Sequence, residues 1–293
     1  MALYFLIWKF MSNHQYIFII GAAKCGTTAL ADMLDQSSDI CLSYPKEPDY
    51  FTDRIYPKGE GWYEACFRDK GCSIRLDSSV SYSAGWAGGS LGIAERIYQF
   101  APNSKIIYLM RDPVDRTWSS YWHSIRNGNK ELPFSECIKD ESSSHITASL
   151  YSERISEYES VFGKENILLL TQKQLNSDPG AVLKKVGQMI GVDDISTQVS
   201  NMGRRVNSSY QFNWFGGLVL KVIPLSFVKR CAHFANRHLP IAVSRSIKAM
   251  ISKGTSEINN EDAILLKEIY SADLDTVEQK YGIDLKTGRW WMS

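Results

Sequence analysis

The chain has 293 residues, of which 44% are hydrophobic and 22% are charged. These values are typical of a soluble globular protein and suit one large α/β domain. Lys and Arg number 33 and Asp and Glu 32, for a net charge of +1. This balance argues against a general nucleic-acid binder but leaves room for a local cationic pocket.

Residues 1–14 are interpreted as an N-terminal extension. The apolar run in M-A-L-Y-F-L-I-W-K-F-M is far shorter than the about 20 residues of a membrane span. It also lacks the basic n-region and small-residue cleavage site of a secretory signal. We therefore expect a cytoplasmic protein.

Six cysteines are scattered along the chain, at positions 25, 41, 66, 72, 137 and 231. They form no C-x-x-C motif and no zinc-like spacing. Without a secretory signal we expect free thiols, with a bridge between Cys66 and Cys72 as the alternative.

The most informative stretch begins with a short apolar run, residues 17–20, which is typical of a buried parallel strand. A turn bounded by Gly21 and Gly26 follows, and Thr27 and Thr28 then open an amphipathic helix. Unpaired N–H groups in the first turn of a helix, together with glycines, predict an anion site. Lys24 lies inside the turn, whereas a Walker A loop places its lysine after the second glycine.

A second short strand is predicted at 40–43, followed by the sequence Y-P-K-E-P-D-Y-F. Pro45 and Pro48 exclude a helix there and hold Lys46 and Glu47 on an extended loop. In α/β proteins such a loop, beside a phosphate site, commonly carries the chemistry. The alternative is a solvated charged loop.

Further along, a short helix is predicted at 61–67, a polar β-prone stretch at 76–82, a helix at 90–101 and a buried strand at 105–110. Asp112 and Pro113 then fit the N-cap and first turn of the next helix.

This strand–helix junction predicts a second anion pocket, formed by Arg111 at the strand end and Ser119 on the helix. His123 shares a helix face with Ser119, because the two are four residues apart. The alternatives are a salt bridge from Arg111 to Asp112 or Asp115 and a surface or packed role for His123.

A helix at 149–162, a buried strand at 166–170 and a helix at 181–190 complete an alternating pattern. The pattern predicts a three-layer α/β fold with a central parallel sheet flanked by helices. We expect one domain over 1–293, with a nucleotide-binding core at 15–200 and a helical C-terminal part at 201–293.

The C-terminal part carries interleaved aromatic and basic residues up to about residue 255. It could form a wall of an acceptor cleft or contact a membrane surface through 212–250. A helix packed on the sheet with a solvated basic face is an equal alternative. A last amphipathic helix is predicted at 261–281, with Trp290 and Trp291 packing the tail onto the body.

With both anion sites identified, the chain resembles the sulfotransferases that use 3′-phosphoadenosine 5′-phosphosulfate (PAPS). The similarity is to the carbohydrate branch, which includes heparan sulfate N- and 3-O-sulfotransferases and bacterial relatives. Four stretches carry it: G-A-A-K-C-G-T-T-A-L, Y-P-K-E-P-D-Y-F, I-I-Y-L-M-R-D-P-V-D-R-T-W-S-S-Y and S-L-Y-S-E-R-I-S-E-Y. The stretch L-D-S-S-V-S-Y is similar to the family's G-E-x-[ST]-P-x-Y, with Val80 where proline is usual.

The resemblance implies a P-loop-like fold and a role for each matching residue. Lys24, Cys25, Gly26, Thr27 and Thr28 would hold the 5′-phosphosulfate, with Lys24 also catalytic. Arg111 and Ser119 would hold the 3′-phosphate. Glu47 would be the acceptor base, with His123 as a second base or orienting group. Arg204 and Arg205, in M-G-R-R, remain candidates for the 3′-phosphate.

The implied reaction moves the sulfuryl group of PAPS to a hydroxyl or amine of a glycan, releasing adenosine 3′,5′-bisphosphate. No metal is expected, because a singly charged sulfuryl group needs less neutralisation than a γ-phosphate. An ATP-dependent kinase and a non-catalytic, membrane-associated nucleotide-binding scaffold are the alternatives. The oligomeric state is not readable from the sequence.

Overall fold

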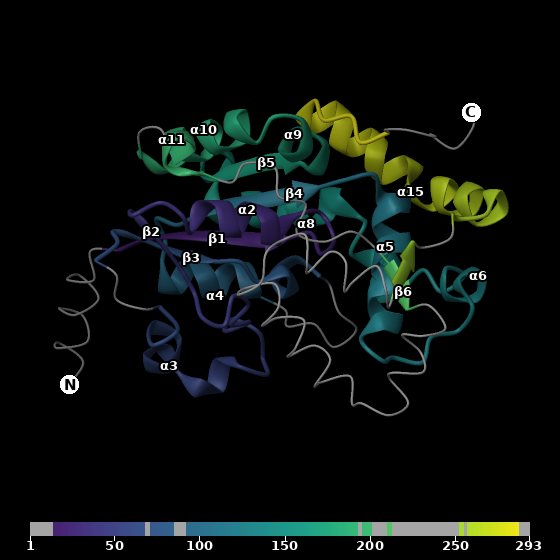
Figure 1. The fold of residues 1–293 in the computed structure, drawn as a ribbon, viewed down its shortest axis with the longest axis horizontal. Coiled ribbons are helices and arrows are strands. Elements are labelled where there is room, and N and C mark those ends of the chain that lie inside the picture. Colours follow the sequence, from purple (N-terminus) through teal and green to yellow (C-terminus); the bar gives the residue numbers. More distant parts are fainter. Residues whose placement is uncertain are drawn as a thin grey trace.

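A computed structural model shows the fold of the chain (Figure 1). It describes residues 14–67, 71–84, 92–192, 195–200, 210–212, 252–254 and 257–286.

Five parallel strands form the central sheet, in the order β2-β3-β1-β4-β5. Their bounds are β1 (Gln15–Gly21), β2 (Ile40–Leu42), β3 (Ile74–Asp77), β4 (Lys105–Met110) and β5 (Ile167–Thr171). The apolar runs of β1 and β4 are buried, as expected for central strands covered on both faces. The predicted parallel sheet flanked by helices is thus confirmed.

Helices cover both faces of this sheet. In Figure 1, α2 (Thr27–Leu34) and α10 (Pro179–Ile190) lie above it and α3 (Glu60–Glu64) and α4 (Ile93–Phe100) lie below it. α8 (Tyr151–Phe162) packs against α4 and against the last helix. The other helices are α5 (Pro113–Arg126), α6 (Phe134–Cys137), α7 (Ser144–Thr147), α9 (Gln172–Ser177), α11 (Ile195–Gln198) and α15 (Asn260–Tyr281), with 3₁₀ turns at Tyr56–Lys58, Val80–Ser83 and Lys164–Asn166.

The stretch predicted as β-prone at 76–82 is strand only up to Asp77, and a 3₁₀ turn follows at Val80–Ser83. The physical reason lies in the serines. The Ser79 hydroxyl donates to Asp77 and accepts from the backbone N–H of Asp49, so local side-chain bonds replace a strand ladder.

The C-terminal part contains the predicted last helix as α15, whose buried residues face α5 and α8. It also contains an antiparallel pair, β6 (Tyr210–Phe212) with β7 (Ser252–Gly254), where only helix was expected. The two strands are far apart in sequence, so local pattern did not reveal their pairing. The stretch 213–251, Arg204, Arg205 and the tryptophan pair near the C-terminus lie outside the described residues.

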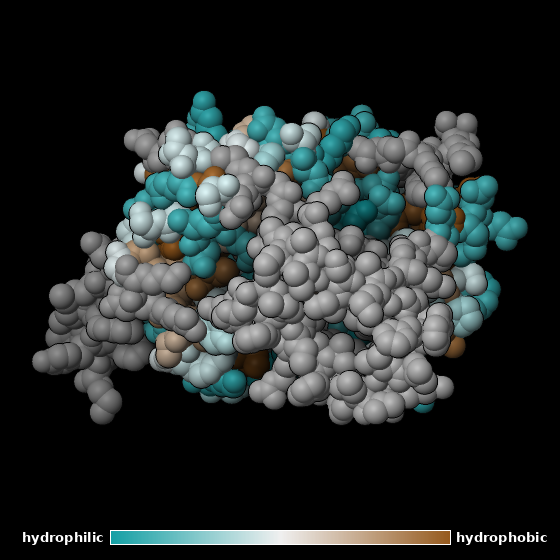
Figure 2. All heavy atoms as spheres, viewed as in Figure 1, coloured by the Kyte–Doolittle hydropathy of each residue, from teal (hydrophilic) through white to brown (hydrophobic). Residues whose placement is uncertain are grey.

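Hydrophilic side chains cover much of the described surface above the sheet (Figure 2). Among the helices that the structure describes, none combines the length and the apolar content needed to cross a bilayer.

A disulfide joins Cys41 and Cys72, whose Cα atoms are 5.9 Å apart. The prediction of free thiols is therefore wrong for these two residues, and Cys66, proposed as the alternative partner of Cys72, is free. The cause is the parallel pairing of β2 with β3, which brings Cys41 beside the start of β3. Disulfides persist mainly in oxidising compartments, which is a point against the cytoplasmic expectation.

Removing this bridge should lower the free energy of unfolding. The bridge spans 31 residues, and a loop of this size predicts a loss of about 2–4 kcal/mol in the Cys41→Ala/Cys72→Ala variant, measured by urea denaturation. Cys137→Ser, which replaces a free thiol, is the matched control. Thiol titration of the denatured protein should count two fewer thiols before reduction than after it, and equal counts would contradict the bridge.

Candidate active site

In the turn between β1 and α2, the backbone at Gly21 lies close to the side chains of Ser83 and Tyr108. A Cβ built on Gly21 would lie 2.0 Å from Ser83 Oγ, so only glycine fits there. Gly26 has φ 100°, the left-handed region that favours glycine, and it caps α2 without a side-chain hydrogen bond. The first N–H groups of α2, from Thr27 onward, are therefore available to an anion.

Cys25 is a buried core residue rather than an exposed ligand. Its side chain is fully buried, and burial raises the pKa of its thiol. Any contribution of Cys25 to anion binding would come from its backbone. Thr27 is buried and Thr28 half-buried at the start of α2.

Lys24 lies in the middle of the turn, at φ 73°. Burial, followed by the positive charges of Arg126 and Arg111, lowers the pKa of its ammonium group to about 8. Desolvation and like charges both disfavour the protonated form, and both would be relieved by an anion bound beside it. Lys24, Arg111 and Arg126 together make the turn a cationic site.

Arg111 and Gln172 both donate to the backbone carbonyl of Lys24, at 3.4 and 3.3 Å. Arg111 follows the end of β4, and Gln172 follows the end of β5. The carboxyl ends of β1, β4 and β5 therefore meet at one oxygen atom. Sequence analysis did not identify Gln172, because its approach depends on β5 lying next to β4.

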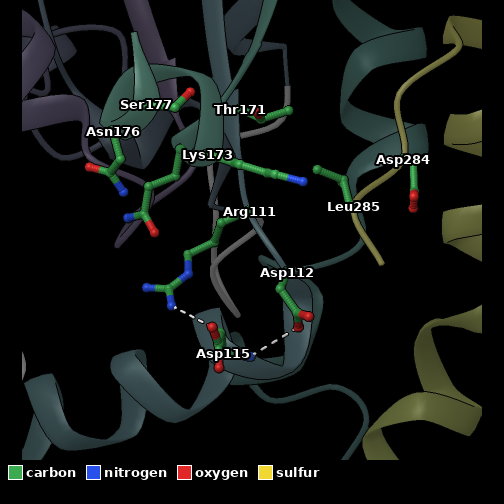
Figure 3. A pocket seen from close by; sticks show the side chains of 10 residues that line it. Arg111, Asp112, Asp115, Thr171, Lys173, Asn176, Ser177, Asp284 and Leu285 are labelled. Carbon is green, nitrogen blue, oxygen red and sulfur yellow. Dashed lines mark hydrogen bonds and ion pairs between the residues drawn. The ribbon is translucent and has the colours of Figure 1, made fainter. Parts of the chain in front are cut away.

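Arg111 also makes the ion pair considered from the sequence, with Asp115 at 2.9 Å (Figure 3). The carboxylate of Asp115 is 54% exposed, so this pair contributes little to stability. Asp112 caps α5 as predicted, by accepting from the backbone N–H groups of Val114 and Asp115. Burial raises the pKa of Asp112 to about 6.

α5 carries Ser119 on a buried position, and His123 follows one turn later on an exposed one. The His123 ring contacts the amide of Asn127 at 3.1 Å. Arg126 lies three residues after His123 on the same helix face, and its positive charge lowers the pKa of Lys24. The positions 119, 123 and 126 share a helix face, a pattern that could have identified Arg126 from the sequence.

The guanidinium of Arg116, by contrast, serves the fold. It is buried and donates to the hydroxyl of Ser149 and to the carbonyl of His145. The neighbouring Thr117 hydroxyl lies 2.7 Å from the hydroxyl of Tyr270, which ties α5 to α15.

Glu47 lies on the loop that follows β2. Its carboxylate is 40% exposed and pairs with the ammonium group of Lys46 at 2.8 Å. This exposure fits both a solvated charged loop and a catalytic role for Glu47. The structure brings the turn and Arg111 into contact through the carbonyl of Lys24, whereas the contact of Glu47 is with the adjacent Lys46.

A cavity of about 380 Å³ opens beside Arg111 at the carboxyl ends of β4 and β5. Arg111 and Lys173 line it on one side and Asp112 and Leu285 on another (Figure 3). Within the described ranges, no three or more His, Cys, Asp or Glu side chains are grouped to hold a metal ion.

The chain is similar in sequence and in fold to known sulfotransferases. The family model described as "Sulfotransferase domain" matches residues 14–214. The bifunctional heparan sulfate N-deacetylase/N-sulfotransferase 1 of Xenopus laevis is 29% identical over 194 residues, which cover 60% of this chain and 22% of that protein. Heparan sulfate glucosamine 3-O-sulfotransferase 3B1 of Mus musculus is 29% identical over 189 residues, covering 61% and 46%. The chain thus spans less than half the length of these relatives.

Among solved structures, a sulfotransferase from Alicyclobacillus acidocaldarius is similar with a TM-score of 0.64 and 20% sequence identity. The match covers 96% of this chain and 99% of that one. At this identity the similarity concerns the fold alone.

The lowered pKa of Lys24 predicts a pH-dependent affinity for anions. As the pH rises through about 8, Lys24 loses its charge, so the affinity for adenosine 3′,5′-bisphosphate should fall by about tenfold per pH unit. Calorimetry between pH 6.5 and 9.5 measures this. Lys24→Arg, which stays protonated, should bind with a flat profile; the same fall in that variant would assign the titration to another group.

Proposed function

Because the chain belongs to the sulfotransferase family, we propose that it transfers the sulfuryl group of PAPS to a hydroxyl or amine of a saccharide, polysaccharide or glycolipid. The family resemblance inferred from the motifs is confirmed, and with it the prediction of an enzyme. The observation that carries the proposal is the contact between the anion-binding turn and Arg111 through the carbonyl of Lys24.

The turn would hold the 5′-phosphosulfate. The N–H groups from Gly26 to Thr28 and the two threonine hydroxyls would bind its oxygens. Lys24 would neutralise the charge that develops on the bridging oxygen as the S–O bond breaks. Its burial supports this role, because a charge in a desolvated site stabilises a developing anion more than one in water.

Arg111 and Ser119 would bind the 3′-phosphate. The guanidinium could exchange the exposed carboxylate of Asp115 for a phosphate that is held in a fixed position. The cavity beside Arg111 supplies space for part of the nucleoside. A second phosphate contact of this kind would select PAPS over ATP.

Glu47 would accept the proton of the acceptor hydroxyl or amine. The acceptor oxygen or nitrogen forms a bond to sulfur while the bond from sulfur to the 5′-phosphate oxygen breaks, and adenosine 3′,5′-bisphosphate leaves. The exposure of Glu47 suits a base that must meet a bulky acceptor. His123 would act as a second base or orient the acceptor.

The saccharide acceptor is supported by the names of the relatives, two of which are heparan sulfate sulfotransferases. The family includes different acceptors on one fold, so the support is by analogy.

Glu47→Gln should remove the carboxylate that accepts the proton of the acceptor, while leaving nucleotide binding intact. We expect kcat for ³⁵S transfer from PAPS to a glycan panel to fall by at least about 100-fold. The Kd for adenosine 3′,5′-bisphosphate should stay within about twofold. Asp53→Asn, an exposed carboxylate paired with Arg96, is the matched control. Near-normal turnover of Glu47→Gln would remove Glu47 as the base.

Arg111→Ala should weaken donor binding specifically. A charged hydrogen bond to phosphate contributes about 1.5–3 kcal/mol, so the KM for PAPS should rise by about 10- to 100-fold. Arg154→Ala, which removes an α8 arginine paired with glutamates, should leave it unchanged. Steady-state kinetics with varied PAPS decide the matter, and an unchanged KM in Arg111→Ala would refute the second phosphate site.

A further inference from the structure

The loop that carries Glu47 is fixed two residues later, at Asp49. This residue has φ 53°, a left-handed conformation that non-glycine residues rarely adopt. Its carbonyl accepts from the hydroxyl and the N–H of Thr52, at 2.6 and 3.1 Å. Its carboxylate accepts from the hydroxyl of Ser81 at 2.5 Å. A strained residue persists only where its surroundings determine it, and such residues cluster at functional sites.

The N–H group of Asp49 donates to Ser79, which lies two residues after the end of β3. Ser79 Oγ accepts from this N–H at 3.1 Å and donates to Asp77 Oδ1 at 2.6 Å. A serine hydroxyl has one proton and two lone pairs. Because its proton is directed to Asp77, a lone pair is left to face the Asp49 N–H. The carboxylate therefore sets the orientation of the hydroxyl that holds the loop.

Asp77 is itself fixed from three sides. It is fully buried at the end of β3, and its Oδ2 accepts from the hydroxyls of Tyr63 and Tyr82 at 2.9 and 2.8 Å. Burial raises its pKa to about 7, which the three hydroxyl donors partly offset. A buried carboxyl is costly to the fold, so its presence here calls for a role beyond packing.

We propose that Asp77 and Ser79 are positioning residues for the transfer reaction, which hold the Glu47 loop in its working geometry through the N–H of Asp49. The left-handed conformation of Asp49 and the buried carboxyl of Asp77 are separate observations. Both residues form a hydrogen bond with the hydroxyl of Ser79. The inference rests on the proposed role of Glu47 as the base.

Two variants separate positioning from plain stability. Ser79→Ala and Tyr63→Phe each remove one hydroxyl that donates to Asp77, but only the Ser79 hydroxyl also bonds to the loop. Tyr63→Phe keeps the ring that stacks on Tyr50. We expect similar losses of Tm in both. In Ser79→Ala, kcat should fall by about tenfold or more, while the KM for PAPS stays within about twofold. Tyr63→Phe should keep kcat within about twofold of wild type. Equal losses of kcat in the two variants, or an unchanged kcat in Ser79→Ala, would overturn the proposal.

The link to Glu47 is tested in a double-mutant cycle. If Ser79 acts through Glu47, Ser79→Ala should cost about twofold or less in residual turnover when added to Glu47→Gln. A full additional tenfold loss would show that Ser79 acts elsewhere. Near-normal turnover of Glu47→Gln alone would instead reject the base, whatever Ser79→Ala does, so the two failures are distinguishable.

Ser81→Ala provides a second route should Ser79→Ala fail to fold. It removes the hydrogen bond to Oδ1 of Asp49 and leaves the ion pair of Asp49 with Arg54 and the contacts of Asp77 in place. We expect kcat to fall by about threefold or more, with the KM for PAPS unchanged. An unchanged kcat in this variant would overturn the proposal.

Discussion

Three strands of the sheet are tied together at the carbonyl oxygen of Lys24. Arg111 reaches it from the end of β4 and Gln172 from the end of β5, while Lys24 itself continues β1. These hydrogen bonds, at 3.4 and 3.3 Å, connect the turn to the ends of both neighbouring strands. A phosphate site needs its donors fixed before the ligand arrives, since ordering them on binding would cost affinity.

The same contact gathers positive charge in a place poor in water. Lys24 is half-buried, and the charges of Arg126 and Arg111 act on it. Such an arrangement destabilises the empty protein, because each ammonium or guanidinium group loses hydration and repels its neighbours. An anion bound beside these groups would offset the cost.

Much of the fold could be predicted from local pattern. The buried runs of β1 and β4 and the cap at Asp112 depend on residues close in sequence. The features that were missed depend on which strands are neighbours. The Cys41–Cys72 disulfide requires β2 beside β3, and the approach of Gln172 requires β5 beside β4. In the site, Arg111 lies against the turn because the ends of β1 and β4 are adjacent. Glu47 contacts its neighbour Lys46, and its role as a base stays a prediction.

We propose that this site recognises a nucleotide with a phosphate on the 3′ position. Calorimetry with adenosine 3′,5′-bisphosphate and adenosine 5′-monophosphate, which differ only in that group, tests it most directly. We expect the bisphosphate to bind at least about tenfold more tightly, since a charged phosphate contact contributes about 1.5–3 kcal/mol. Equal affinity for the two nucleotides would contradict it.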